Sequence, residues 1–355
     1  MKFALWRIAV RRKVESHIGF SLVLTSRQNS GKVGVELGLV DSASIRYCRM
    51  RGEFCSVRSS HIIRSVDPMR LFPRRWSCRL MPLTISLHTP SSIPLEVDTV
   101  VLETVRGQSA DDVKQTLIQR GNRQVPVGEF FHVHGSAADD NTLVWQGDLA
   151  KVKLIGTKLT TGTTRVEGNA GMHLGAEMSG GEIIVDGNVA DWCGAEMHGG
   201  SIRVRGNAGH LVGAVYRGGH KGMTGGEILI HGDAGNEVGH GIRRGLIAVA
   251  GNIGDFAGVG MIAGTILVGS SGGIRHGAGM KRGTIAFLNA ASGFDPLPTF
   301  RSSGSYQPTF LRLILRDLQV AGFAVPDGAA DATYERWCGD LVELGKGELL
   351  VRQAV

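Results

Sequence analysis

Glycines recur every nineteen residues through the middle of this sequence, and that spacing constrains the fold more than any other feature. Six glycines follow one another at steps of 19, 26, 19, 19 and 19: Gly181, Gly200, Gly226, Gly245, Gly264 and Gly283. A second series keeps the same steps: Gly175, Gly194, Gly213, Gly239, Gly258 and Gly277. One insertion of seven residues accounts for the single longer step. A fixed period of this length indicates a solenoid built from one structural unit.

Each unit opens with a short segment in which β-branched residues alternate with others, as in Glu182–Asp186 and Ser201–Arg205. Alternation with a period of two indicates a strand with one buried face. Alignment of the units then places isoleucines in one inward column: Ile183, Ile202, Ile228, Ile247, Ile266 and Ile285. We therefore expect an all-β fold, a right-handed parallel β-helix of nineteen-residue coils over residues 142–289, with coils about 4.8 Å apart.

Three further columns follow from the same alignment. The first holds Met178, Met197, Met223, Met261 and Met280, with Ile242 standing in once. The second holds Leu174, Cys193, Val212, Val238, Ala257 and His276, and the third holds Asn169, Asn188, Asn207, Asp233, Asn252 and Ser271. A copper-binding methionine cluster or a nucleophilic Cys193 is conceivable. Repetition at one position instead favours core filling by methionine, a buried thiol and corner-forming asparagines.

The segments that flank the repeat have a different pattern. Residues 109–122, which begin Ser-Ala-Asp-Asp, and residues 309–321, which precede Gly322, both have apolar residues at helical spacing. We expect an α/β cap over residues 81–141 and a helical cap and tail over residues 290–355. Such caps would cover the open ends of the coil.

The basic character of the chain resides in its first 80 residues. They contain 16 Lys and Arg against five Asp and Glu, whereas the remaining residues contain 23 against 27. We interpret residues 1–80 as a basic extension, either disordered or translated from sequence upstream of a true start at Met81. The acidic balance of the rest predicts no nucleic-acid partner. The absence of a long apolar run predicts no membrane span, and the cysteine usage favours the cytoplasm.

Two groups of polar residues could carry chemistry. Glu167 and Asp186 occupy the same outward position on successive units, at a separation typical of retaining glycosidases, although Arg205 and His231 continue that column as in an ordinary charge ladder. His132 and His134 share one face of a predicted strand, where a structural role is the simpler interpretation.

Cations gather near the insertion. The insertion carries Arg217, His220 and Lys221, and a column two units apart carries Arg243, Arg244, Lys281 and Arg282. On an acidic domain such an edge could hold a partner subunit or a polyanionic ligand, or could simply be solvated.

Several of these segments resemble the C subunit of formylmethanofuran dehydrogenases, including that of the bacterial formyltransferase/hydrolase complex. The similar segments are Gly168–Gly181, Gly187–Gly200, Gly222–Gly226, Val238–Gly245 and the closing Cys338–Leu349. A more distant resemblance is to the C-terminal β-helix domain of glutamate synthase large subunits, where the coil is a spacer.

The nearer resemblance implies a non-catalytic assembly subunit that binds an amidohydrolase-like A subunit, a B subunit and a formyltransferase-like D subunit. It implies that a methanofuran-type cofactor and metals belong to those partners, and that this chain binds no cofactor or metal alone. The bacterial complex of tetrahydromethanopterin-linked formaldehyde oxidation to formate is favoured. A molybdenum or tungsten dehydrogenase and a self-sufficient β-helix hydrolase acting through Glu167 and Asp186 are the alternatives.

Overall fold

The computed structural model describes residues 21–29, 32–41, 44–46, 81–289 and 294–354, which fall into two compact units, Met1–Trp76 and Ser77–Val355. In the first unit, β1 (Ser21–Asn29), β2 (Lys32–Asp41) and β3 (Ser44–Arg46) form an antiparallel sheet. The interpretation of residues 1–80 as disordered or upstream of a true start stays a prediction, because most of them lie outside the described residues.

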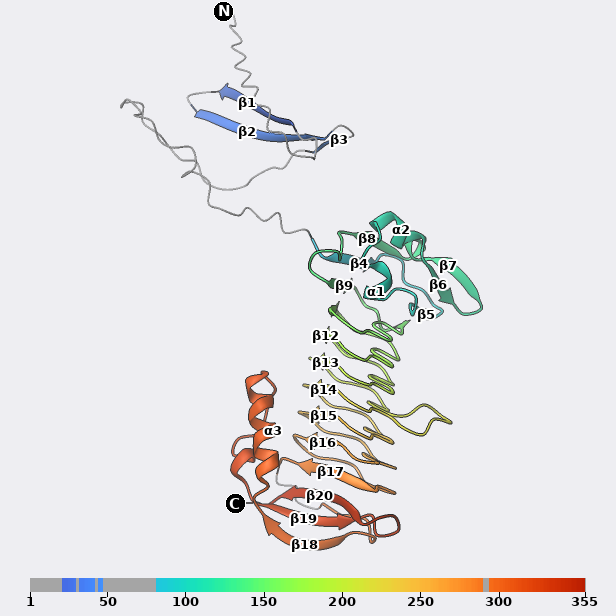
Figure 1. Cartoon of the computed structure of the whole chain (residues 1–355), viewed down its shortest axis with the longest axis vertical. Helices are drawn as coiled ribbons and strands as arrows, with labels where there is room; N and C mark the ends of the chain where they lie inside the picture. Colours follow the sequence, from blue (N-terminus) through green and yellow to red (C-terminus); the bar gives the residue numbers. More distant parts are fainter. Residues whose placement is uncertain (1–20, 30–31, 42–43, 47–80, 290–293, 355) are drawn as a thin grey trace, which may run out of the picture. The chain divides into compact units, whose positions relative to one another are not determined.

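The second unit is mostly β-structure. Thirteen of the described strands form one sheet in the order β18-β19-β20-β17-β16-β15-β14-β13-β12-β11-β9-β4-β8 (Figure 1). Its repeat strands are β9 (Thr142–Gln146), β11 (Thr163–Glu167), β12 (Glu182–Val185), β13 (Ser201–Val204), β14 (Glu227–Ile230), β15 (Leu246–Val249), β16 (Thr265–Val268) and β17 (Arg282–Phe287). Its outer strands are β4 (Leu83–Leu87), β8 (Phe131–His134), β18 (Arg301–Tyr306), β19 (Tyr334–Gly339) and β20 (Lys346–Arg352).

The repeat strands pair in parallel with their counterparts in the next unit. Ile183 pairs with Ile202, Ile247 with Ile266, and Ile266 with Ile285. A second ladder of parallel bridges runs alongside: Leu149 to Ala170, Val189, Ala208, Ala234, Ile253 and Gly272. The backbone of each unit is therefore satisfied by its neighbours. We call residues 142–287 the repeat stack.

The inward columns expected from the alignment fill the repeat stack. All six members of the isoleucine column and all six of the methionine column are fully buried. Cys193 is also fully buried, and burial raises the pKa of its thiol to about 12. This burial confirms the prediction of a core thiol, and a thiol with so high a pKa is a poor nucleophile.

Side chains at one corner hydrogen-bond along the stack. The backbone N–H of Asn188 donates to Oδ1 of Asn169 at 2.9 Å, and the same bond recurs in the following units, as the asparagine column predicted. A second such ladder, through Asp191, His210, Asn236 and Asp255, was not predicted from the sequence. Each ladder gives an acceptor to a corner N–H that the strands leave unpaired.

The cap that precedes the repeat differs from the prediction. Its further elements are β5 (Leu95–Glu96), α1 (Leu102–Val105), α2 (Ala110–Gln115), β6 (Leu117–Arg120), β7 (Arg123–Pro126) and a 3-10 turn (Val127–Glu129). The short strand β10 (Val152–Lys153), within the repeat stack, pairs in parallel with β5. Ser109 caps α2 as expected, its side chain accepting from the Asp112 N–H. The helix predicted to reach residue 122 is wrong beyond Gln115, because residues 117–126 form a hairpin that turns at Gly121, where φ is +60°.

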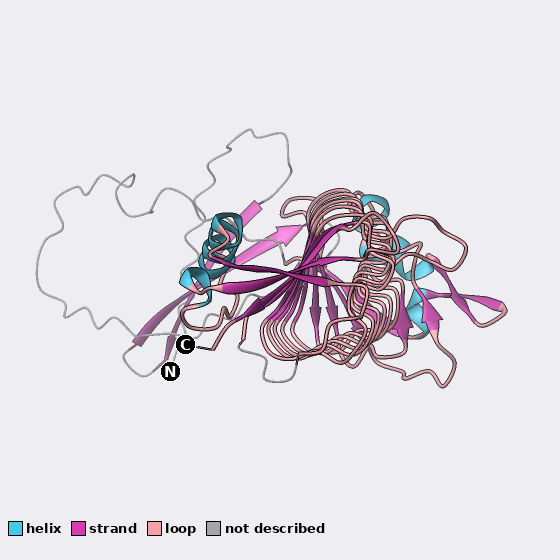
Figure 2. Cartoon of the chain, turned by 90° about the horizontal axis from the view of Figure 1, so that it is seen from below, coloured by secondary structure: helices cyan, strands magenta, loops and turns pink. Residues whose placement is uncertain are grey.

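The second predicted helix is α3 (Thr309–Val320), which ends before Gly322, where φ is +79°. The expectation that this helix covers the open end of the coil is wrong. Leu311, Leu315 and Leu318 instead pack on the outer face of strands β14–β17 and β20. Figure 2 shows this helix, in cyan, beside the strands and outside the coils. Beyond β17 the sheet continues at that end with β20, then β19, then β18.

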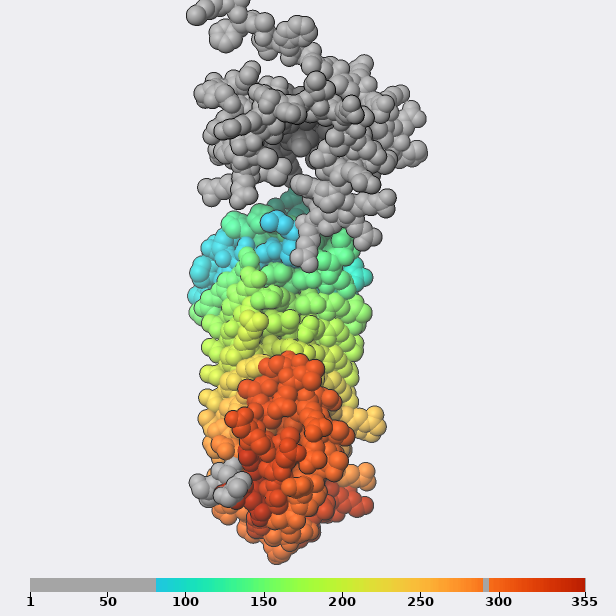
Figure 3. All heavy atoms as spheres, turned by 90° about the vertical axis from the view of Figure 1, so that its left-hand side faces the viewer, coloured from blue at the N-terminus to red at the C-terminus, as the bar shows by residue number. Residues whose placement is uncertain are grey.

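The outer face of the sheet explains where α3 lies. Outward positions hold Leu229, Ala248, Leu267 and Ala286 beneath the helix, whereas in the preceding coils Ile184 lies between Arg165 and Arg203. Figure 3 shows the orange C-terminal segment covering the later coils and leaving the earlier, green coils uncovered. No helix in the described part of the chain is long and apolar enough to cross a bilayer.

Candidate functional site

Four cations line one depression of about 560 Å³ at the corner that precedes the strands. Arg243 and Arg244 come just before Gly245, and Lys281 and Arg282 just before Gly283, two glycines whose φ angles of +106° and +102° turn the chain into β15 and β17. Two rungs separate the pairs, about 10 Å at ordinary strand spacing. All four side chains are exposed, and none takes part in an ion pair with another described residue. We call these four residues the basic edge.

The insertion is fastened to the stack by an aromatic cluster. The Tyr216 ring stacks on Trp192 with centroids 5.0 Å apart, and its hydroxyl hydrogen-bonds Nδ1 of His173 at 3.0 Å. The Tyr216 N–H also donates to Oε1 of Glu196 at 3.0 Å. Burial raises the pKa of Tyr216 to about 12 and lowers that of His173. These groups are therefore neutral near pH 7 and act as a structural anchor.

Residues 217–221 of the insertion (Tyr216–Gly222) are exposed, and they include Arg217, His220 and Lys221. These three residues do not line the depression of the basic edge, and no described contact joins them to it. The structure thus brings together four of the seven predicted site residues and places the other three on a separate loop. The prediction of one continuous seven-residue edge has no support beyond the four.

The two carboxylates of the hydrolase alternative belong to a charge ladder. Arg165 lies between them, with Nη2 2.7 Å from Oδ2 of Asp186 and Nε 3.6 Å from Oε1 of Glu167. Asp186 is also paired with Arg205 at 2.8 Å, and Gln146 donates to Glu167 at 2.9 Å. Carboxylates so engaged do not face a common substrate space, which weakens the glycosidase-like interpretation.

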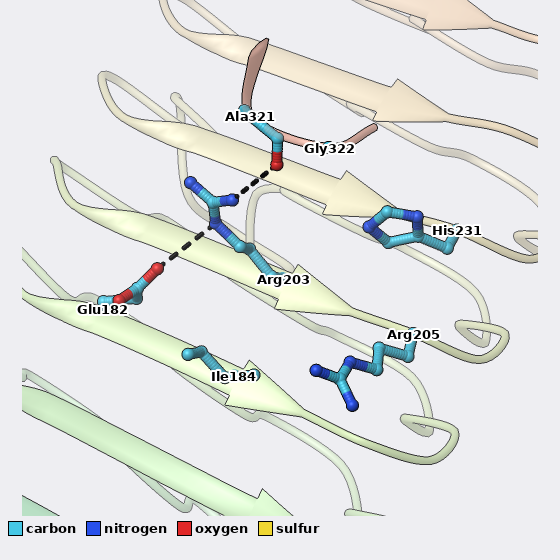
Figure 4. A pocket seen from close by; sticks show the side chains of 7 residues that line it. All are labelled: Glu182, Ile184, Arg203, Arg205, His231, Ala321 and Gly322. Carbon is cyan, nitrogen blue, oxygen red and sulfur yellow. Dashed lines mark hydrogen bonds and ion pairs between the residues drawn. The ribbon is translucent and has the colours of Figure 1, made fainter. Parts of the chain in front are cut away.

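A second depression, of about 470 Å³, lies between the outer sheet face and the end of α3 (Figure 4). Arg203 crosses the depression from the sheet to α3. Its Nη1 donates to the Ala321 carbonyl at 3.0 Å, and its Nε lies 3.2 Å from Oε1 of Glu182. The ring centroids of His231 and Phe323 lie 5.2 Å apart. Burial lowers the pKa of His231, and the positive charges of Arg203 and Arg205 lower it further. Arg203 and His231 thus contact the segment that ends α3, and Arg205 is paired with Asp186.

Two exposed histidines lie close together on the strand β8. His132 and His134 share the exposed face of β8, as predicted, and His88 stacks on His132 with centroids 4.2 Å apart. Within the described residues, no three His, Cys, Asp or Glu side chains are arranged to hold a metal ion.

One further surface was not predicted from the sequence. Leu341, Val342 and Leu344 lie on the loop between β19 and β20 and are 52, 77 and 53% exposed, and Leu344 lines the depression of the basic edge. The segment belongs to the part of the chain that carries the family resemblance, but a single non-repeated loop has no periodicity that marks it as exposed.

Comparisons with known proteins give a consistent relationship. No protein-family model matches the chain. It is 39% identical over 87 residues to the C subunit of the tungsten-containing formylmethanofuran dehydrogenase 2 of Methanothermobacter wolfeii, covering 24% of this chain and 32% of that protein. It is 40% identical over 83 residues to the C subunit of the molybdenum-containing formylmethanofuran dehydrogenase 1 of Methanothermobacter marburgensis, covering 23% and 21%. The match thus spans a third or less of these curated relatives.

A solved structure is matched much more completely. The chain aligns with a TM-score of 0.70 and 33% identity to a chain in the crystal structure of the formyltransferase/hydrolase complex (FhcABCD) from Methylorubrum extorquens in complex with methylofuran. The alignment covers 77% of this chain and 100% of that one.

Proposed function

This chain belongs to the family of formylmethanofuran dehydrogenase C subunits, and from that membership we propose that it is a non-catalytic assembly subunit of a formyltransferase/hydrolase complex. The match along the whole of a chain from such a complex carries the proposal. The same match favours this complex over a molybdenum or tungsten dehydrogenase. Oxidation of a one-carbon unit to formate would then be the activity of the assembly.

The described side chains support a role in assembly. Cys193 and the methionines fill the core, the carboxylates of the outer face are paired with arginines, and His173 and Tyr216 anchor a loop. The hydrolase alternative through Glu167 and Asp186 would require breaking the ion pairs of Arg165.

The finer parts of the proposal concern fold, partners and cofactor. The parallel pairing offset by nineteen residues supports a parallel β-helix. Its right-handedness and a cap over residues 81–141 are proposed with it, whereas helix α3 of the C-terminal segment packs on the outer face of the sheet. Amidohydrolase-like A, B and formyltransferase-like D subunits are the proposed partners, and the methanofuran-type cofactor and metals are proposed to reside in them. We propose a cytoplasmic location for the complex. The distant relation to glutamate synthase stays a prediction.

Partner recovery tests the proposal. A tagged full-length chain, purified gently from its native cells, is expected to bring down A-, B- and D-type subunits in a fixed ratio, as identified by mass spectrometry. Recovery of the chain alone, with hydrolytic activity of its own, would contradict it and favour the self-sufficient hydrolase.

A further inference from the structure

The loop between β19 and β20 presents apolar side chains that the described chain does not cover. Over the six residues 340–345, Leu341, Val342 and Leu344 are each more than half exposed. Scattered surface leucines are ordinary, but three large apolar side chains on so short a loop form a patch, and such patches mark interaction sites.

The loop is held firmly in this exposed position. Asp340 is 6% exposed, and its carboxylate accepts hydrogen bonds from the backbone N–H groups of Gly279 and Val342, both at 3.0 Å. The Leu341 N–H donates to the Thr299 carbonyl at 3.1 Å, and the Gly345 N–H to the Asp340 carbonyl at 2.9 Å. Although burial raises the pKa of Asp340, its hydrogen bonds lower it overall, so the carboxylate is charged near neutral pH.

The loop is continuous with the basic edge. Leu344 lines the same depression as Arg243, Arg244, Lys281 and Arg282. Lys346, which follows the loop, pairs with Arg282 across the β17–β20 register. In Figure 1 the loop lies at the end of the sheet where β17 begins. Glu343 is the one carboxylate that the loop exposes, so positive charge prevails around the apolar side chains.

We propose that Leu341, Val342 and Leu344, together with the basic edge, form one docking surface for a protein partner. The proposal rests on the proposed function, since the partner would be another subunit of the same complex. Its complementary face would carry an apolar pocket rimmed by Asp and Glu side chains. An apolar centre with a charged rim is the usual anatomy of a specific protein interface.

A polyanionic ligand tail fits the same surface less well. Carboxylates of such a tail would pair with the arginines and lysine of the basic edge, but would leave Val342 77% exposed and the two leucines more than half exposed. Covering all three requires an apolar partner surface. The insertion loop carries cations without such an apolar centre, which sets it apart from this surface.

The test uses the full-length chain and its recovered partner subunits. One double variant is Val342→Asn with Leu344→Asn, and another is Arg243→Glu with Arg282→Glu. The matched control is Leu313→Asn with Val320→Asn, two apolar residues of α3 that are 58 and 90% exposed. Each variant is checked by its thermal unfolding midpoint, and its affinity for the wild-type partner subunits is measured.

Both surface variants are expected to lose at least about tenfold in affinity, as truncated interface anchors do, while the α3 control stays within about twofold. Binding by the loop variant at the level of the control would overturn the proposal. Weakening by the arginine variant alone, with loss of binding to a polyglutamate peptide, would replace it with a polyanion site. If the wild-type chain captures no partner, the proposed function fails as well.

Discussion

Two glycines of one coil offer a matched test of how the repeat stack is packed. Gly258 and Gly260 have φ angles of +66° and +61°. An alanine at either position should therefore lower the free energy of unfolding by about the same 1–2 kcal/mol, because its backbone is left-handed. Their surroundings differ. A Cβ on Gly258 would lie 2.6 Å from Cδ1 of the fully buried Ile285, whereas a Cβ on Gly260 would meet nothing closer than Cδ2 of His240 at 4.0 Å.

Gly258→Ala should therefore cost more than Gly260→Ala by the energy of overpacking a core, about 1–3 kcal/mol. For a unit of this size each kcal/mol lowers the unfolding midpoint by roughly 2–4 °C, so the two variants should differ by about 2–12 °C. Differential scanning calorimetry under identical conditions measures the difference between the two variants. Comparison of Gly260→Ala with the wild-type chain gives the loss of stability that both variants share, which comes from the left-handed backbone. Equal midpoints for the two variants would refute the inward packing of this corner against the isoleucine column.

Three further predictions concern other parts of the fold. Met197→Ala, which empties a fully buried position, should lower the unfolding free energy in urea by about 2–5 kcal/mol, and a loss below about 1 kcal/mol would contradict close packing of the methionine column. Tyr216→Ala should speed tryptic cleavage of the insertion, whereas Tyr216→Phe, which keeps the stack on Trp192, should change the cleavage rate little. Equal cleavage rates for the alanine variant and the wild-type chain would rule out the anchor. Burial lowers the pKa of His276 below its ordinary 6.5, so the folded chain binds fewer protons than the unfolded one and stability is lost as the pH falls below about 6.5. His276→Leu should flatten that loss between about pH 7 and pH 5, and an unchanged pH profile would contradict it.

The periodic part of the fold could be predicted from the sequence because each coil contacts its immediate neighbours. Alignment of the nineteen-residue units therefore predicted which residues contact one another, as the pairing of Ile183 with Ile202 shows. Residues 117–122 were missed for the opposite reason. The capping box of Ser109 specifies where α2 starts, but the Gly121-Asn122 pair is a two-residue hairpin signal that ends the helical pattern early.

The candidate site was predicted only where it shares the repeat. Arg243 and Lys281 occupy one column, so their neighbourhood follows from the period, and the structure groups them. The direction of the insertion depends on Tyr216 stacking across two coils on Trp192 and His173, a long-range contact with no periodic signal. The exposure of Val342 likewise depends on how Asp340 is held by a distant coil, through Gly279.

The central claim, that this chain assembles a complex and performs no chemistry itself, is tested most directly by assaying formate release from a formylated methanofuran-type substrate. The isolated chain, the partner subunits without it and the reconstituted assembly are compared at equal concentrations. We predict no turnover by the chain alone and full turnover only in the assembly. Turnover by the isolated chain, or full activity of partners that lack it, would contradict the claim.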